Sequence, residues 1–327
     1  MIQLKNVTKK FNHRGIAGLH QISCDFLPSE VIGLIGSNGS GKTTLLNLLA
    51  QNILPDVGEI SHQGRIHYYS SDLTQKDLSS RVIDFLIREV SESIVDEEKR
   101  LQIVRDYADV LEFTSQLYQK TSELSSGQKQ KVLLTRAFLK KPDFLLLDEA
   151  FSHLDPQSKN EIFKLLFPLF KREQISLIWI HHDLEEVIKY SDKIILLNFG
   201  RIEQFESTET LLNAPRNIHV ARYLKFENFI HIKKIKNHLW ETPWGERELS
   251  SFEKNEAYLV IPNSAWEISE SGIEMSLEFS HLKHDQQVYK VYYQELPLTF
   301  SRSLKLPRLS GSVKLIPRFE ECFLIPI

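Results

Sequence analysis

The chain has 327 residues, of which 42% are apolar and 25% charged, as in soluble globular proteins with room for two domains. Its 40 Lys and Arg against 43 Asp and Glu give a net charge of −3, which excludes a global basic field for nucleic acid. No apolar run reaches the roughly 18–20 residues of a membrane span, and we expect no signal peptide. Cys24 and Cys322 lie far apart and indicate free thiols in a reducing compartment.

A glycine-rich loop lies in the first sixth of the chain. Residues 2–8 alternate as an edge strand does, 22–26 predict a second strand, and the apolar run 31–35 predicts a buried one. The next residues fit G-x-x-x-x-G-K-[ST]: Gly36, Ser37, Asn38, Gly39, Ser40, Gly41, Lys42, Thr43 and Thr44. A leucine-rich helix at 45–50 follows, so the order is strand, loop and helix, as a phosphate-binding loop requires.

The residue types of this loop suit a nucleoside triphosphate. Glycines permit positive φ, so that backbone N–H groups can surround phosphate oxygens, and the helix N-terminus beyond them favours anions. Lys42 is expected to reach the β- and γ-phosphates, and the Thr43 hydroxyl is expected to ligate Mg²⁺.

A segment of helical pattern follows. Residues 73 to about 120 carry apolar side chains at helical spacing and predict a helical insert, in which Asp96-Glu97-Glu98 forms a solvated first turn. The serines of Leu124-Ser125-Ser126-Gly127-Gln128 can cap the helix that begins there and ends at Lys141-Pro142. By itself this sequence indicates only a capped helix with an anion-binding N-terminus.

Two carboxylates follow the apolar run 144–147. Asp148 and Glu149 therefore stand at the end of a strand buried on both faces, where open α/β sheets bind ligands. Asp148 suits Mg²⁺, and Glu149 can accept a proton from an attacking water. Further on, Asp155 can cap a helix that starts at Pro156.

A further buried strand, residues 176–180, ends in two histidines. A neutral imidazole there can bond a γ-phosphate or hold a water. Because neighbouring side chains of a strand point to opposite sides, we expect His181 and His182 to diverge, which disfavours joint metal ligation. Residues 193–198 and 199–202 predict a closing hairpin.

The order of these motifs resembles the ATPase subunit of the ATP-binding cassette (ABC) superfamily over residues 1–215. The resemblance implies an α/β P-loop NTPase fold with a helical subdomain at about 73–140, and ATP and Mg²⁺ as cofactors. It also implies a dimer that holds ATP between the Walker A loop of one subunit and the signature of the other.

The resemblance assigns roles residue by residue. Phe11, about 25 residues before the loop, would stack on adenine, and Gly36 to Thr44 would hold the phosphates and Mg²⁺. The signature residues Ser125, Ser126, Gly127 and Gln128 would bind the γ-phosphate in trans. Catalytic and switch roles fall on Lys42, Asp148 (Mg²⁺), Glu149 (general base), Asp155 (D-loop) and His182 (switch histidine).

Three positions depart from the family pattern. Ser126 stands where the signature usually has glycine, and Ala150 stands where proline commonly follows the glutamate. The Q-loop glutamine, which senses Mg²⁺ and couples to the membrane partner, is replaced by Ser71 in the expected register. Either Gln75 reaches in from a shifted loop, or Ser71 and its neighbour Asp72 do a modified task; we favour the second.

Residues 216–327 predict a small all-β, barrel-like domain. The expected strands are 230–235, 257–261, 272–279, 287–293, 296–300, 312–316 and 322–327. The stretches 220–228 and 241–245 resemble the TOBE-like domain of ferric, sulfate, molybdate and polyamine importers. Residues 260–263 lack that family's Arg-Pro-Glu, so regulation by a small ligand and a purely dimer-stabilising role both stay open. We expect Trp240, Trp244 and the tyrosines near 289–293 to lie in a core or an interface.

The resemblance implies a cytoplasmic ATPase that is peripheral on the inner face of the membrane and powers solute import. Its implied partners are permease subunits, a second ATPase subunit as a homodimer, and indirectly an external solute-binding protein; no nucleic acid is expected. One alternative is the ATPase of a glycan exporter with a carbohydrate-binding C-terminal domain. The other is a soluble ABC protein that acts on ribosomes or DNA. The transported solute stays open.

Overall fold

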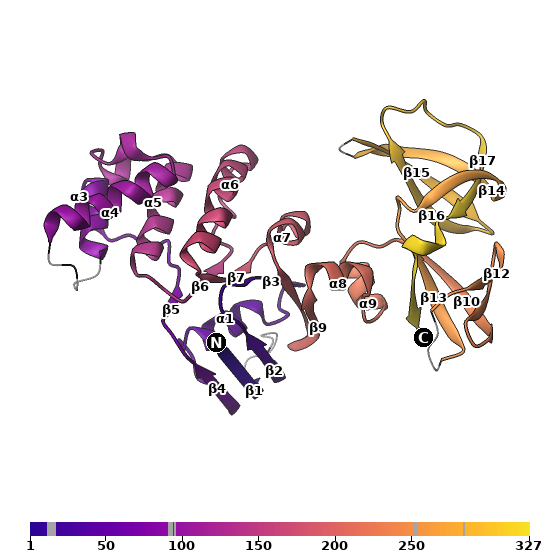
Figure 1. Ribbon diagram of the computed structural model, residues 1–327, viewed down its shortest axis with the longest axis horizontal. Helices are drawn as coiled ribbons and strands as arrows, with labels where there is room; N and C mark the ends of the chain where they lie inside the picture. The colour runs from indigo at the N-terminus through magenta and orange to yellow at the C-terminus, as the bar shows by residue number, and fades with distance from the viewer. Residues whose placement is uncertain (12–17, 91–93, 95, 251–253, 284) are drawn as a thin grey trace. The chain divides into compact units, whose positions relative to one another are not determined.

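The computed structural model describes residues 1–11, 18–90, 94, 96–250, 254–283 and 285–327. These residues form two compact units, Met1–Thr208 and Glu209–Ile327, each with its own hydrophobic core (Figure 1). Among the described residues, no helix is both long and apolar enough to cross a membrane.

A six-stranded sheet organises the first unit. Its order is β5 (Ile66–Tyr68), β6 (Phe144–Asp148), β7 (Ser176–Ile180), β3 (Val31–Gly36), β8 (Lys193–Asn198) and β9 (Arg201–Ser207). All neighbours are parallel except the hairpin β8–β9. Every residue of β3 and β7 is buried, because layers cover both faces of this sheet. The buried strands and the hairpin expected from the sequence are confirmed.

Helices and a second sheet form those covering layers. On one face, α1 (Lys42–Leu49) shares a core with β1 (Ile2–Lys9) and β2 (Leu19–Phe26), which form an antiparallel sheet with β4 (Val57–His62). On the other face, Trp179 of β7 packs against Phe163 and Phe167 of α6 (Pro156–Glu173). The Trp179 indole also donates to Ser191, just past α7 (Leu184–Tyr190).

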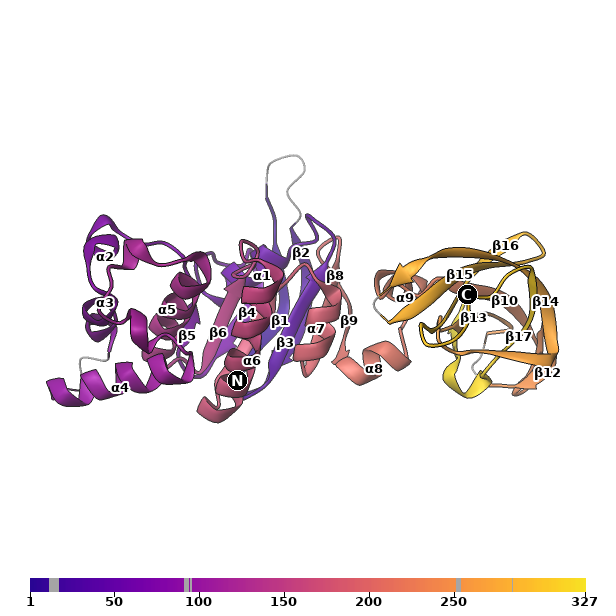
Figure 2. The same cartoon turned by 90° about the horizontal axis from the view of Figure 1, so that it is seen from above.

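The described residues of the insert between β5 and β6 form four helices. They are α2 (Gln75–Ser79), α3 (Val82–Glu89), α4 (Glu97–Val110) and α5 (Ser126–Leu139), with single 3₁₀ turns at Thr114–Gln116 and Thr121–Glu123. In both views they gather beside the β5 edge of the sheet (Figures 1 and 2). Asp96 caps α4 by accepting from the N–H groups of Glu98 and Lys99, so the acidic run forms an exposed first turn, as expected.

The second unit begins with two short helices, α8 (Thr208–Asn213), which starts at the last residue of the first unit, and α9 (Ile218–Tyr223). Two antiparallel sheets then enclose one core. The first is β12 (Gly245–Glu248), β11 (Leu239–Thr242), β10 (Asn228–Lys236), β13 (Glu256–Ile261) and β18 (Phe323–Pro326). The second is β16 (Leu296–Ser303), β15 (Gln286–Tyr293), β14 (Trp266–Lys283) and β17 (Ser312–Pro317). A 3₁₀ turn, Phe319–Glu321, precedes β18.

Two features of this unit differ from the sequence expectation. The hairpin β11–β12 was not expected, because its second strand, Gly-Glu-Arg-Glu, has no apolar alternation. The strand expected at 272–279 runs from Trp266 to Lys283, and its pairing with β17 shifts between Ile268 and Ile273. This irregularity carries the strand through a polar stretch that reads as a break. Trp240, Trp244 and Tyr289 lie in the core, as expected.

One buried amide joins the two sheets. The Asn228 side chain, at the start of β10, donates to the Ile261 carbonyl at 2.8 Å and to the Thr299 carbonyl of β16 at 2.9 Å. It also accepts from the Thr299 N–H. Because Asn228 is fully buried, these bonds satisfy backbone groups that water cannot reach.

Asn228→Ala is therefore expected to destabilise the second unit by roughly 2–3 kcal/mol, since it leaves several buried polar groups unpaired. Urea unfolding followed by tryptophan fluorescence measures this, because Trp240, Trp244 and Trp266 all belong to this unit. Asn255→Ala, at an exposed position, is the matched control. Equal midpoints for the two variants would contradict the assigned role of Asn228.

Candidate functional site

The glycine-rich loop has the backbone that a phosphate cradle needs. It connects the end of β3 to α1, with φ of 150° at Gly36 and 103° at Gly41. A Cβ at Gly36 would lie 2.2 Å from the Leu197 carbonyl oxygen, and one at Gly41 would lie 2.7 Å from Leu19 Cδ2. Glycine is required at both positions by space as well as by backbone conformation.

The start of α1 offers free donors. Gly41 is its N-cap and supplies no side-chain acceptor, so the first N–H groups of the helix stay available to an anion. Lys42 Nζ donates to the carbonyls of Gly36 at 2.8 Å and Ser37 at 3.1 Å, which keeps the ammonium over the loop. Burial lowers the pKa of Lys42, and the carboxylates of Glu149 and Asp148 oppose this shift. The buried Ser40 hydroxyl has no hydrogen-bond partner among the described residues.

The two carboxylates expected beside the loop stand where β6 ends. Asp148 is the last residue of β6 and is half-buried, whereas Glu149 is exposed. Glu149 has a φ of 47° and donates its N–H to the Ile180 carbonyl at the end of β7. A non-glycine residue in this left-handed region is strained, and such strain concentrates at functional sites.

One residue of the loop motif and both carboxylates line a cavity of about 890 Å³. Its lining residues are Thr43, Tyr68, Tyr69, Ser70, Ser71, Ser126, Lys129, Gln130, Leu133, Asp148, Glu149, Ala150, Ser152, His153 and Leu154. Thus Thr43 of the loop motif and the carboxylates of Asp148 and Glu149 face one space, although more than 100 residues separate them. Ser126 of the signature sequence lines the same cavity.

The two candidates for the Q-loop position, Ser71 and Gln75, lie in different places relative to the cavity. Ser71 lines the cavity, whereas Gln75 is the exposed first residue of α2 and is not part of the lining. Thr74 and Asp77 form a capping box at this helix, which fixes where α2 starts. The geometry therefore favours the modified task of Ser71 over a reach by Gln75.

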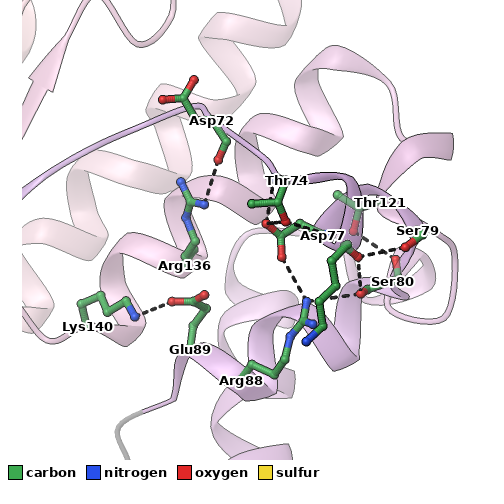
Figure 3. A network of polar contacts seen from close by, with 11 residues as sticks. Asp72, Thr74, Asp77, Ser79, Ser80, Arg88, Glu89, Thr121, Arg136 and Lys140 are labelled. Carbon is green, nitrogen blue, oxygen red and sulfur yellow. Dashed lines mark hydrogen bonds and ion pairs between the residues drawn. The ribbon is translucent and has the colours of Figure 1, made fainter.

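Bonds from α5 hold this segment in place. Arg136 donates to the carbonyls of Ser70 and Asp72, and Figure 3 shows its contact with Asp72. The Tyr69 hydroxyl donates to Gln130 Oε1 at 3.0 Å. The insert has further internal pairs, Arg88–Asp77 and Lys140–Glu89, seen in the same view. The helix that starts at the signature is thus tied to the loop that carries Ser71.

The signature residues form a capping box at the start of α5. Ser125 Oγ accepts from the Gln128 N–H at 3.3 Å, and Gln128 Oε1 accepts from the Ser125 N–H at 3.0 Å. This arrangement leaves the N–H groups of Ser126 and Gly127 at the helix N-terminus for an anion. A Cβ on Gly127 would lie 3.4 Å from Ser158 of α6, so the signature lies against the helix that Asp155 caps.

The two histidines do not diverge, contrary to the sequence expectation. Their ring centroids lie 4.6 Å apart, because β7 ends at Ile180 and the alternation of a strand no longer applies beyond it. His182 is exposed and is not part of the cavity lining. His181 is buried and stacks on Trp179 at 5.3 Å.

A buried charge network surrounds His181. Its Nε2 is hydrogen-bonded to Glu186 Oε2, and Glu186 Oε1 pairs with Lys159 Nζ at 2.9 Å. Lys159, on α6, is itself buried. None of the sequence patterns above predicts this network. Its signal in the sequence is a lysine on the apolar face of a helix that also carries Ile162, Phe163 and Leu166. These bonds fix the backbone on one side of His182, and Asp183, which caps α7, fixes it on the other.

Phe11 and Thr44, two further predicted site residues, do not line the cavity. Phe11 is partly exposed and lies two residues past the end of β1, and residues 12–17 lie outside the described residues. Adenine stacking by Phe11 therefore stays a prediction. Thr44 lies in the first turn of α1 and is not part of the cavity lining.

The second unit has a smaller cavity of about 380 Å³. Three lysines, Lys225, Lys283 and Lys290, line it together with His281 and Glu227. The charged side chains are exposed, so the hollow is an open, mildly basic groove.

Comparison with known proteins shows which family the first unit resembles. Residues 19–152, which span the phosphate loop, the insert, the signature and both β6 carboxylates, match the family model described as ABC transporter. Over these residues the first unit resembles the ATPase cassettes of the ABC transporter family. Its α/β P-loop fold, followed by an all-β region, agrees with the fold class expected from the sequence.

Several curated relatives resemble the cassette. A "Sulfate/thiosulfate import ATP-binding protein CysA" of Mesorhizobium japonicum is 27% identical over 260 residues, covering 73% of this chain and 72% of the relative. A CysA of Caulobacter vibrioides is 25% identical and covers 97% of both chains. An "Fe(3+) ions import ATP-binding protein FbpC" of Haemophilus influenzae is 28% identical, covering 68% of this chain and 67% of the relative.

Solved structures share the fold of the cassette. An inward-facing putative metal-chelate type ABC transporter matches 76% of this chain and 98% of its own, with a TM-score of 0.59 and 21% identity. A dimeric cassette, MJ0796, bound to ADP and Pi matches 64% of this chain and 99% of its own, with a TM-score of 0.53 and 23% identity.

Acidification is expected to destabilise the cassette through His181. Burial lowers the pKa of His181 below its ordinary 6.5, although the hydrogen bond to Glu186 opposes this shift. Below about pH 6.5 the unfolded chain therefore binds a proton that the folded chain does not, and stability falls as the pH falls. Urea unfolding at several pH values measures this. His181→Gln, which cannot titrate, should show a shallower pH slope, and equal slopes would contradict the assignment.

Proposed function

We propose that the chain is the ATP-binding and ATP-hydrolysing subunit of an importer, built as a cassette over residues 1–215 and a β-domain over 216–327. The proposed hydrolysis of ATP rests on one observation: Thr43, Asp148 and Glu149 line the same cavity. Import is supported by the names of the relatives, which are import ATP-binding proteins for sulfate/thiosulfate and Fe³⁺.

The residues present fit a Mg²⁺ ion that arrives with ATP. No group of three or more His, Cys, Asp or Glu within the described chain could hold a metal by itself. Mg²⁺ normally takes one or two protein oxygens and completes its shell with phosphates and water. The Thr43 hydroxyl and the Asp148 carboxylate, which line the same cavity, supply that small set. When bound, the ion neutralises charge on the phosphates.

In the proposed reaction, the residues of the chain position the triphosphate and a water. The N–H groups of the loop and Lys42 bind the phosphates, and Glu149 orients the attacking water and accepts its proton. The signature residues Ser125 to Gln128 of a second subunit complete the charge stabilisation. A switch role for His182 is supported by two observations. Its ring is exposed, and the residues on either side of it are held by hydrogen bonds.

The proposed assembly is a homodimer of cassettes beneath two permease subunits. It is supported by the dimeric solved cassette. It is also supported by the start of α5, where the N–H groups of Ser126 and Gly127 take no part in the capping box. A permease and an external solute-binding protein then supply the path and the specificity. The cassette would be cytoplasmic and peripheral on the inner face of the membrane.

Glu149→Gln is expected to reduce ATP turnover by at least about 100-fold, since it removes the proton acceptor, while ATP binding survives. Phosphate release measures turnover, and light scattering with ATP measures the dimer, which should accumulate. Glu161→Gln, on the exposed face of α6, is the control. Hydrolysis at the wild-type rate by Glu149→Gln would refute the role.

His182→Ala is expected to reduce steady-state turnover by about tenfold or more while ATP affinity changes little, because the side chain would act on the γ-phosphate or water. His62→Ala is the matched control, since His62 is an exposed histidine on β4. If the two variants turn over ATP equally fast, His182 is not the switch.

A further inference from the structure

Tyr68 connects the edge of the sheet to the carboxylate of the proposed metal site. It is the last residue of β5, and its hydroxyl donates to Asp148 Oδ2 at 3.1 Å. In the parallel register Tyr68 lies beside Leu146, two residues before Asp148, so both side chains emerge on the same face. The two residues are 80 positions apart in sequence, and both line the 890 Å³ cavity.

This bond occupies one oxygen of Asp148 and leaves the other. No hydrogen bond to Asp148 Oδ1 occurs among the described residues, so this oxygen is available to a ligand. The terminal torsion of an aspartate is broad, and a carboxylate at a strand end rotates unless something holds it. Residues that hydrogen-bond a ligating carboxylate orient it, and their removal typically lowers metal affinity or activity by 10–100-fold.

We propose that Tyr68 is a positioning residue for the divalent cation of ATP: its hydroxyl holds Asp148 Oδ2 so that Oδ1 faces the ion. The inference rests on the proposed function of Asp148. It also bears on the departure at the Q-loop. Ser71 is too short to repeat the reach of a glutamine, whereas Tyr68 supplies a hydrogen-bond donor at the metal site from a β-strand.

A purely structural role for Tyr68 predicts a different experimental result. The ring packs at the edge of the main core, and Phe would keep that packing while removing only the hydroxyl. The neighbouring Tyr69 provides a matched control: it lines the same cavity, but its hydroxyl bonds Gln130 instead of Asp148. Tyr68→Phe and Tyr69→Phe thus delete the same atom from the same wall, and only one deletion touches the metal ligand.

The experiment measures how much Mg²⁺ strengthens ATP binding. In the full chain carrying Glu149→Gln, the Kd of a fluorescent ATP analogue is measured in EDTA and in excess Mg²⁺. Tyr68→Phe is expected to reduce the ratio of these two constants by about tenfold while the Kd in EDTA is unchanged. Tyr69→Phe should leave the ratio as in the parent. An unchanged ratio in Tyr68→Phe, or an equal fall in both variants, overturns the inference.

A double-mutant cycle tests whether the effect passes through Asp148. With Asp148→Asn as background, Tyr68→Phe should have no further effect on the ratio, because the two residues act as one unit. A tenfold fall that persists in this background would overturn the inference. A parent that does not bind ATP at all would instead refute the proposed function, and the inference with it.

Discussion

The close packing of parallel, fully buried strands is the constraint on which the cassette depends. β3, β6 and β7 have no exposed residue before their carboxyl ends, so polar groups are confined to the points where the strands stop. The phosphate loop follows β3, Asp148 ends β6, and Glu149 comes directly after it. Because the strands run in one direction, these groups meet in one cavity, which is the general site of ligands in open α/β sheets.

Polar side chains outside the phosphate loop and β6 connect the elements of the cassette. From α5, Arg136 and Gln130 bond the segment that carries Ser71, so the signature helix and the cavity wall are one connected structure. Between α6 and α7, Lys159 and Glu186 form a buried ion pair that continues to His181. Removal of one member of such a pair leaves an uncompensated buried charge, which is strongly destabilising.

The second unit also depends on a buried polar group. Its two sheets share an apolar core, but hydrophobic packing by itself does not specify how one sheet is placed on the other. Asn228 does so, since its amide reaches the backbone of β13 and of β16 at once. A hydrogen-bonded amide of this kind requires one register, and the surrounding tryptophans then fill the space that it defines.

Much of this protein was determined by local sequence. The phosphate loop, the capped signature helix and the apolar strand that ends in Asp148 and Glu149 are contiguous patterns, whose geometry follows from glycine, capping and burial. Only the tertiary structure decided the Tyr68–Asp148 bond, the burial of His181, the choice of Ser71 over Gln75 at the cavity wall, and the course of β14. Each of these depends on contacts between residues far apart in sequence, or on where a strand stops. Composition and periodicity carry no record of such partners, because they describe only neighbours along the chain.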